Sequence, residues 1–174
     1  MTSGGLVTAV VEDSGSNVSV EMGKVSFQSD KIPVNGKNRE VLNETMEVDG
    51  QQFKFCAATI GNPHCVVLKG NHTQNEVRRI GPLIENHPIF PNRTNVQFLE
   101  VLDRDTIRIE IWERGAGYTL ASGSSSCAAA SVAKRLGLCE KKIAVLMPGG
   151  QIDITVNEDY KISMSGPVLS LIHI

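Results

Sequence analysis

One segment limits the fold of this chain more than any other. Residues 125–136 read Ser-Ser-Cys-Ala-Ala-Ala-Ser-Val-Ala-Lys-Arg-Leu, and Gly137 follows them. Alanine favours helix and glycine commonly ends one, so the segment predicts a helix over 125–136. Small apolar residues cover more than one stripe of this helix, whereas a surface helix keeps a polar face. The helix should therefore be buried.

Most of the remaining chain is typical of strands. Alternating or β-branched runs are bounded by turn residues, and Asp49-Gly50 and Gly149-Gly150 are hairpin signals that favour antiparallel pairing. Strands are expected at 6–11, 17–22, 41–48, 52–60, 64–68, 95–101, 106–112, 142–147, 151–156 and 161–164. A second helix is expected at 75–85, broken at Pro82 because proline lacks an N–H donor.

The simplest architecture that buries the alanine-rich helix is an α+β fold. A roll or barrel of mostly antiparallel strands would wrap around one central helix. A helix packed between a sheet and a loop would leave a similar pattern. At 174 residues the chain suits one domain.

Composition excludes several function classes. The net charge of -2 gives no footprint for nucleic acid. No apolar stretch approaches the roughly 18 residues of a membrane span, and the first 20 residues do not form a signal peptide, which favours the cytoplasm. The four cysteines lack a C-x-x-C pair and a histidine at ligand spacing. We expect no metal site, and reduced, mostly buried thiols.

The densest polar chemistry lies at 112–126, between an expected strand and the buried helix. Glycines and small hydroxyl residues around Ser122 leave backbone N–H groups exposed at a helix start, where they attract an anion. A carboxylate or phosphate fits such a position, and a serine-rich N-cap that only ends its own helix fits the pattern equally. Neither a nucleotide P-loop nor a G-x-S-x-G motif occurs, which disfavours nucleotide phosphate and acyl transfer.

Two further segments resemble site loops. Gly61-Asn62-Pro63-His64 interrupts one strand, and Asn95 stands at the head of another. Taken alone, the first segment is explained equally well as an Asx-type turn, and Asn95 as an ordinary strand entry.

Together, these motifs resemble the C-terminal half of the diaminopimelate epimerase family. The order is Gly61-Asn62-Pro63-His64, then Asn95-Val96-Gln97-Phe98, then Glu113-Arg114-Gly115-Ala116-Gly117, then Thr119-Leu120-Ala121-Ser122-Gly123-Ser124 leading into Cys127-Ala128-Ala129. The resemblance extends from about Thr2 to Pro167. It implies two similar halves, each a strand roll around a central helix, with the substrate in the cleft between them.

The resemblance also implies a cofactor-independent reaction. Two cysteines on opposite faces of a free amino acid remove and return its α-proton, with neither metal nor pyridoxal phosphate. Asn62 and Asn95 would bind the distal end of the substrate, and Glu113 and Arg114 would contact it. Gly123 and Ser124 would present N–H groups to the α-carboxylate, while His64 and Glu113 would tune the acidity of the cysteine pair.

This chain departs from the family pattern in three places. Ser122 stands where the second catalytic cysteine is expected, and Cys127 matches a helix cysteine that is not catalytic. The N-terminal half, with its own cysteine, has no counterpart here, so Met1 is interpreted as an internal methionine. The C-terminal half is expected over 1–168, with an atypical tail at 169–174 that is interpreted as foreign.

The expected function is the interconversion of LL- and meso-diaminopimelate in lysine and cell-wall precursor synthesis. The chain alone is expected to be inactive, to need the missing N-terminal half as its partner, and to be able to form a homodimer, as family members often do. A related amino-acid racemase or dehydratase, or a non-catalytic carboxylate-binding or amino-acid-binding domain, remains an alternative.

Overall fold

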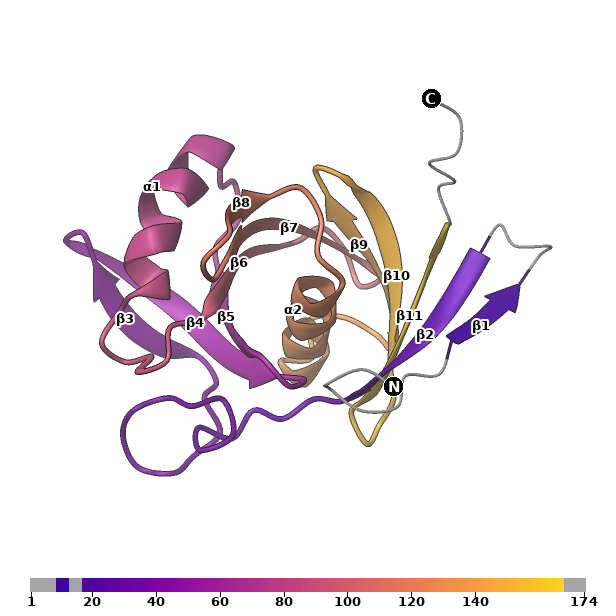
Figure 1. Ribbon diagram of the computed structural model, residues 1–174, viewed down its shortest axis with the longest axis horizontal. Coiled ribbons are helices and arrows are strands. Elements are labelled where there is room, and N and C mark those ends of the chain that lie inside the picture. Colours follow the sequence, from indigo (N-terminus) through magenta and orange to yellow (C-terminus); the bar gives the residue numbers. More distant parts are fainter. Residues whose placement is uncertain (1–8, 13–16, 168–174) are drawn as a thin grey trace.

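The computed structural model describes residues 9–12 and 17–167. Within them, eleven strands form one sheet and two helices pack against it (Figure 1). The strands are β1 Ala9–Glu12, β2 Asn17–Lys24, β3 Glu44–Val48, β4 Gln51–Thr59, β5 Pro63–Leu68, β6 Asn95–Val101, β7 Thr106–Glu113, β8 Gly117–Thr119, β9 Lys142–Met147, β10 Gly150–Val156 and β11 Lys161–Pro167. The helices are α1 Gln74–Glu85 and α2 Gly123–Arg135.

The sheet curves around α2 into a roll. Its order is β1-β2-β11-β10-β9-β7-β6-β5-β4-β3, with β8 paired to β7, and neighbours are antiparallel except for β5–β6 and β7–β9. An antiparallel bridge between Ser26 and Thr59 joins the segment after β2 to the end of β4. The roll is thereby closed around the helix, and Figure 1 shows α2 with strands around it.

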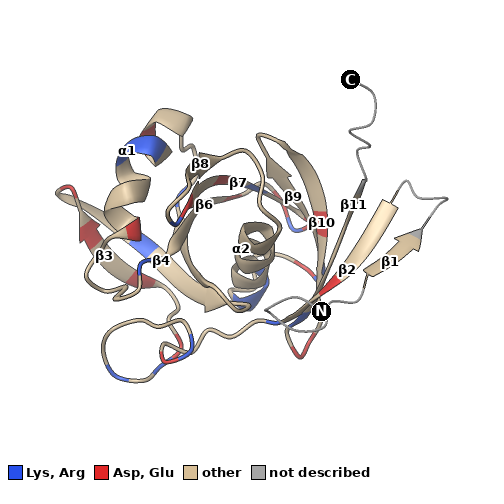
Figure 2. Ribbon diagram, viewed as in Figure 1, with Lys and Arg blue, Asp and Glu red and all other residues tan. Residues whose placement is uncertain are grey.

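The larger core lies inside this roll. Helix α2 is buried from Ser125 to Ala133 and contacts residues from strands on all sides, such as Val66, Ile109 and Ile154. Charge appears on α2 only in its last turn, at Lys134 and Arg135 (Figure 2). Alanine makes the helix thin, and the sheet can therefore close tightly around it.

A second core lies on the outer face of the same sheet, beneath α1. Phe53, Phe55 and Phe98 project from β4 and β6 toward Val77 and Ile80 of α1. Side chains alternate between the two faces of a strand, so β4, β5 and β6 are buried on both sides. These strands form a rigid support between the two cores.

The expected architecture is confirmed. Strands lie at all ten expected positions, with bounds that differ from the expected ones by no more than three residues; residues 6–8 of the first lie outside the described residues. Strand β8 was not expected. Asp49 and Gly50 form the β3–β4 turn with the positive φ of a type I′ hairpin. The second hairpin turns one residue earlier than expected, at Pro148 and Gly149.

The expected break at Pro82 was wrong. Helix α1 runs unbroken through this residue to Glu85. Pro82 lies in the last turn, so the missing N–H removes only the bond to the Arg78 carbonyl. The Pro82 carbonyl accepts from both the backbone N and Nδ2 of Asn86, which ends the helix. Packing against the sheet holds the turn in place.

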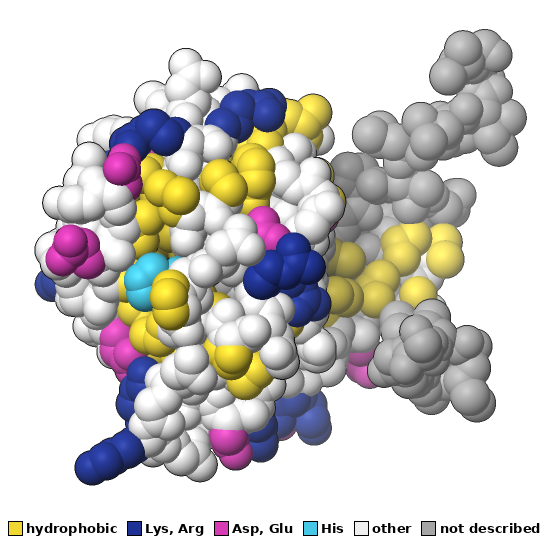
Figure 3. Space-filling view, turned by 60° about the vertical axis from the view of Figure 1, so that its left-hand side comes forward, with side chains coloured by type: hydrophobic (Ala, Val, Ile, Leu, Met, Phe, Trp, Pro, Cys, Tyr) yellow, Lys and Arg dark blue, Asp and Glu magenta, His cyan; other side chains and the backbone are white. Residues whose placement is uncertain are grey.

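No helix in the described ranges is long and apolar enough to cross a membrane. On the face shown in Figure 3, basic and acidic side chains are interspersed among polar and apolar ones. The expected tail at 169–174 lies outside the described residues.

Candidate active site at the start of helix α2

Ser122 is the N-cap of α2. Its backbone is extended, with φ −158° and ψ 121°, and its Oγ accepts from the N–H of Ser125 at 3.4 Å. Its carbonyl accepts from the N–H of Ser126 at 3.0 Å and from Ser126 Oγ at 2.9 Å. Serine is among the best N-cap residues because its short side chain reaches these donors. Ser122 therefore caps α2, as the N-cap interpretation of the sequence predicted.

The first two N–H groups of α2 point out of the helix. Those of Gly123 and Ser124 precede the first intrahelical donor and have no acceptor among the described residues. The positive end of the helix dipole lies at the same place, and no acidic residue occupies the first turn. This geometry suits a carboxylate.

Asn62 reaches the helix start from the β4–β5 turn. Its Nδ2 donates to Ser124 Oγ at 3.4 Å, and Ser124 Oγ lies 3.5 Å from Ser122 Oγ. On its other side, Asn62 Oδ1 lies 3.0 Å from His64 Nε2, so this nitrogen carries the proton. A chain of polar contacts thus connects His64 to Ser122.

His64 is completely buried on the α2 side of β5, the face that it shares with Val66. Burial lowers the pKa of His64 to about 4, with the neighbouring Gln97 side chain opposing the shift and the Arg114 charge adding to it. His64 is therefore neutral near pH 7. A neutral, buried imidazole acts on the site through Asn62 and makes no contact with solvent.

Asn95 joins the other two loops of the site. Its Nδ2 donates to the Pro63 carbonyl at 2.9 Å, and its Oδ1 accepts from the N–H of Arg114 at 3.0 Å. The side chain is buried. In this structure Asn95 thus holds the 61–64 turn and the 113–117 loop together.

Glu113 is the last residue of β7 and follows Ile107, Ile109 and Ile111 on the face toward α2. Its side chain is half-buried, and Arg114 beside it is exposed. Arg114 Nη1 donates to the Asn92 carbonyl at 3.0 Å. The hydrogen bond to Asn95 places this loop beside the 61–64 turn.

Two supporting residues were missed from the sequence. Gln97 donates from Nε2 to Ser125 Oγ at 3.0 Å, which ties β6 to the first turn of α2. Glu85, at the end of α1, accepts from the N–H of Gly115 at 3.0 Å. Gln97 lies within the quoted Asn-Val-Gln-Phe motif, and its polar side chain on a buried strand was the available signal.

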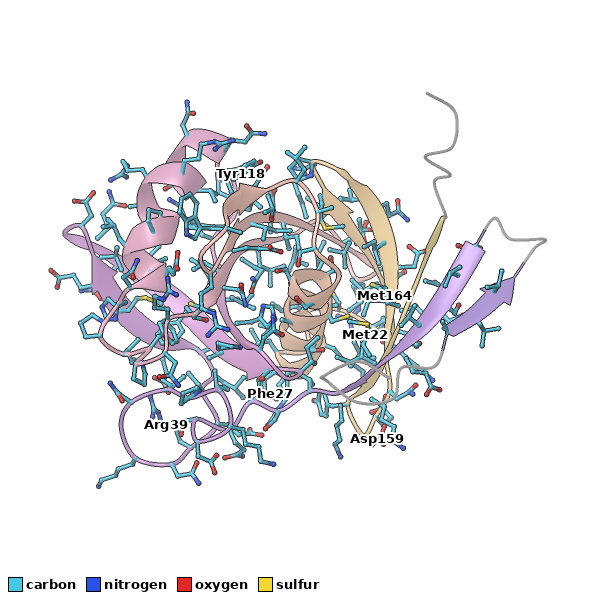
Figure 4. The ribbon with its side chains drawn as sticks, in the orientation of Figure 1. Met22, Phe27, Arg39, Tyr118, Asp159 and Met164 are labelled. Carbon is cyan, nitrogen blue, oxygen red and sulfur yellow. The ribbon has the colours of Figure 1, made fainter. Side chains whose placement is uncertain are left out.

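An apolar cavity of about 370 Å³ adjoins the helix start. It lies between β2, β10 and β11, and Ala121, Ile152 and Met164 are among its lining residues. Met22 and Met164 point from β2 and β11 toward α2 (Figure 4). The turn after β9 closes one side, because Gly149 N–H donates to the Leu120 carbonyl at 2.7 Å.

The four cysteines are free and buried, as expected. Burial raises the pKa of Cys127 to about 12 and that of Cys65 well above its usual value. The pKa values of Cys56 and Cys139 are also raised, mainly by burial. A thiol must lose its own proton before it can act as a base, so none of these cysteines is suited to that step.

Known proteins resemble this chain in sequence. The family model described as diaminopimelate epimerase matches residues 56–170. Diaminopimelate epimerase 2 from Nostoc sp. is 59% identical over 170 residues, covering 98% of this chain and 60% of the relative. Diaminopimelate epimerase from Desulfitobacterium hafniense is 40% identical over 162 residues, covering 93% and 57%. The chain thus spans about 60% of the length of these relatives.

Solved structures show the same fold at low sequence identity. A hydroxyproline epimerase from Agrobacterium vitis superposes with a TM-score of 0.63 at 16% identity, covering 94% of this chain and 54% of that one. A probable proline racemase from Agrobacterium radiobacter gives 0.61 at 14% identity, covering 97% and 58%. The match of the family model over most of the chain settles the family: this chain belongs to the diaminopimelate epimerase family.

Proposed function

We propose that this chain is the carboxylate-binding half of an amino-acid epimerase that interconverts LL- and meso-diaminopimelate without a cofactor. The observation that carries the proposal is the start of α2, where the N–H groups of Gly123 and Ser124 point outward beside Asn62. The relatives' names supply the substrate, since they are diaminopimelate epimerases. The whole reaction requires the remaining part of a protein as long as these relatives.

In this proposal the helix start stabilises charge. An α-carboxylate bound to the N–H groups of Gly123 and Ser124 accepts part of the negative charge that develops when the α-carbon loses its proton. Asn62 keeps Ser124 in position, and Asn95 and Arg114 bind toward the distal end of the substrate. Glu113, at the edge of the same loop, acts on the acidity of the reacting groups.

Ser122 limits the proton transfer that this half can perform. A cysteine thiol has a reference pKa of about 8.5, whereas a serine hydroxyl ionises far less readily. The hydroxyl is also engaged with the N–H of Ser125. Ser122 is therefore suited to donate a proton or hold a water, and the base that removes the α-proton belongs to the other half.

The same observation supports a second candidate function. A site that binds the carboxylate but lacks an ionisable thiol also fits an amino-acid-binding domain, a related racemase, or a dehydratase, for which proton removal on one face is sufficient. Isothermal titration with diaminopimelate, together with product analysis, distinguishes these functions from epimerisation. Tight binding without α-proton exchange would favour the binding domain.

The test measures exchange of the α-proton of diaminopimelate in deuterium oxide by NMR. The 174-residue chain is joined to the preceding region found in the relatives, and the wild type is compared with Ser122→Cys. The same substitution at Ser165, on the opposite face of β11 from Met164, is the matched control. We expect Ser122→Cys to raise the exchange rate and Ser165→Cys to leave it unchanged. Absence of exchange in all three proteins would refute the epimerase proposal.

In this role the protein would act in the cytoplasm, where lysine and cell-wall precursors are made, and would work as a homodimer. Sedimentation velocity at several concentrations tests the second statement.

A further inference from the structure

Glu85 is a buried carboxylate that the proposed chemistry does not use. It is the last residue of α1 and is only 5% exposed. Its Oε2 accepts from Trp112 Nε1 at 2.7 Å, and its Oε1 accepts from the N–H of Gly115 and from Arg93 Nη1, each at 3.0 Å. Burying a charge is costly unless it is paired and hydrogen-bonded, and here three donors compensate it.

Two of these donors flank the site residues. Trp112 immediately precedes Glu113, and Gly115 immediately follows Arg114. Glu85 therefore holds the segment on both sides of Glu113 and Arg114. The indole of Trp112 is itself packed against α1, because a Cβ added at Gly81 would lie 2.6 Å from Trp112 Cγ. The end of α1 and the loop thus meet without a gap.

Asn95 holds the backbone next to the position that Glu85 holds. The N–H of Arg114 donates to Asn95 Oδ1, and the next N–H, that of Gly115, donates to Glu85 Oε1. The backbone N–H groups of two consecutive residues are thus held by two different buried side chains, those of Asn95 and Glu85. The loop backbone therefore has little freedom to rotate. A flexible loop loses conformational entropy when a ligand orders it, and a loop fixed in advance avoids that loss.

The ion pair with Arg93 does not account for this arrangement. The Arg93 side chain is 53% exposed, and exposed ion pairs contribute little to stability. The bonds to Gly115 and Trp112 connect Glu85 to the site loop instead.

We propose that Glu85 is a positioning residue that fixes the Glu113–Gly115 segment for substrate binding without touching the substrate. Its effect on substrate rests on the proposed function, whereas its effect on the loop does not. Glutamine in its place would keep one acceptor oxygen without the charge, and aspartate would keep the charge but fall short of both Gly115 and Trp112.

The test uses Glu85→Gln and Glu85→Asp in the 174-residue chain. Glu76→Gln is the matched control, because Glu76 lies on the same helix in an ion pair with Lys69. Amide hydrogen exchange measured by NMR should quicken about tenfold at Gly115 in both Glu85 variants, as expected when a charge-assisted bond is lost. Exchange at Ile109 in the middle of β7 should not change. Trp112 is the single tryptophan, so its fluorescence reports the lost indole bond.

Ligand titration gives the second readout. In the chain joined to the preceding region found in the relatives, diaminopimelate affinity should fall about tenfold in the Glu85 variants and not in Glu76→Gln, measured at a temperature at which every variant is folded. Arg93→Ala, which removes only the ion pair, should leave Gly115 exchange as in the wild type. Equal quickening at Gly115 and Ile109, or none at either, would overturn the proposal. If the wild type joined to the preceding region of the relatives binds no diaminopimelate, the proposed function fails, while the exchange comparison in the 174-residue chain still decides the role of Glu85.

Discussion

Asn62 Nδ2 donates to Ser124 Oγ at 3.4 Å, joining two residues that are 62 positions apart in the chain. This contact connects the β4–β5 turn to the first turn of α2. Asn62 Oδ1 also lies 3.0 Å from His64 Nε2, so the amide is held between two neighbours. The helix start is thus preorganised by a side chain from a distant strand.

Replacing Asn62 should therefore weaken ligand binding more than folding. In Asn62→Ala, Ser124 loses its donor and His64 its acceptor, and we expect the dissociation constant for diaminopimelate to rise about tenfold. Isothermal titration measures the change. Asn35→Ala, which removes a bond to the Pro88 carbonyl outside the site, is the control and should bind like the wild type. Equal affinities in the two variants would contradict this role.

Ser122 should stabilise α2 irrespective of catalysis. Ser122→Ala removes the acceptor for the Ser125 N–H, and loss of an N-cap costs about 1 kcal/mol of unfolding free energy. Ser122→Gly should cost only a few tenths, roughly, because a bare N-cap lets water reach the same donors. Urea denaturation followed by circular dichroism compares the variants. An alanine variant as stable as the wild type would show that the cap contributes nothing.

His64 should make the fold sensitive to acid. Its pKa is about 4 in the folded protein, below the value of about 6.5 of an exposed histidine, so the unfolded chain binds more protons between these values. The contribution of neutral His64 to the free energy of unfolding is fully present above about pH 6.5. It is lost as the pH falls through about 4, and its magnitude is on the order of 3 kcal/mol.

The measurement is urea denaturation at pH 7 and pH 4.5. The loss of unfolding free energy between these pH values should be smaller in His64→Gln than in the wild type. His87→Gln, at a half-buried histidine after α1, is the control and should keep the wild-type loss. If His64→Gln and the wild type lose equal stability, another group causes the acid sensitivity.

Gly81 should be essential for the contact between α1 and Trp112. An added methyl group would lie 2.6 Å from Trp112 Cγ, and overpacking of this kind costs about 1–3 kcal/mol. Alanine would otherwise favour a helix interior by about 1 kcal/mol, so a net loss would identify the steric term. Gly70→Ala, where the nearest atom lies 3.8 Å away, is the control. Differential scanning calorimetry should show a lower melting temperature for Gly81→Ala only.

Several features of the fold followed from local pattern. The alternation along β6 and β9 was enough to place both strands at their observed bounds. The apolar surface of α2 required burial, which the closed roll provides. By contrast, Pro82 was expected to break the helix at 75–85, and the packing of that turn against Trp112 and the sheet kept it helical.

For the site, the sequence by itself determined which residues belong together, because Asn62, Asn95, Glu113 and Ser122 stand in motifs with a characteristic order. It also shows serine at position 122, where the resemblance predicts a cysteine, since the identity of a side chain is fixed without reference to its surroundings. Only the tertiary structure decided how these residues act. It buried His64 as a neutral partner of Asn62 and placed Glu85 against Gly115. The physical reason is that hydrogen bonds and desolvation depend on neighbours in space, and the closure of the sheet around α2 brings those neighbours from distant parts of the chain.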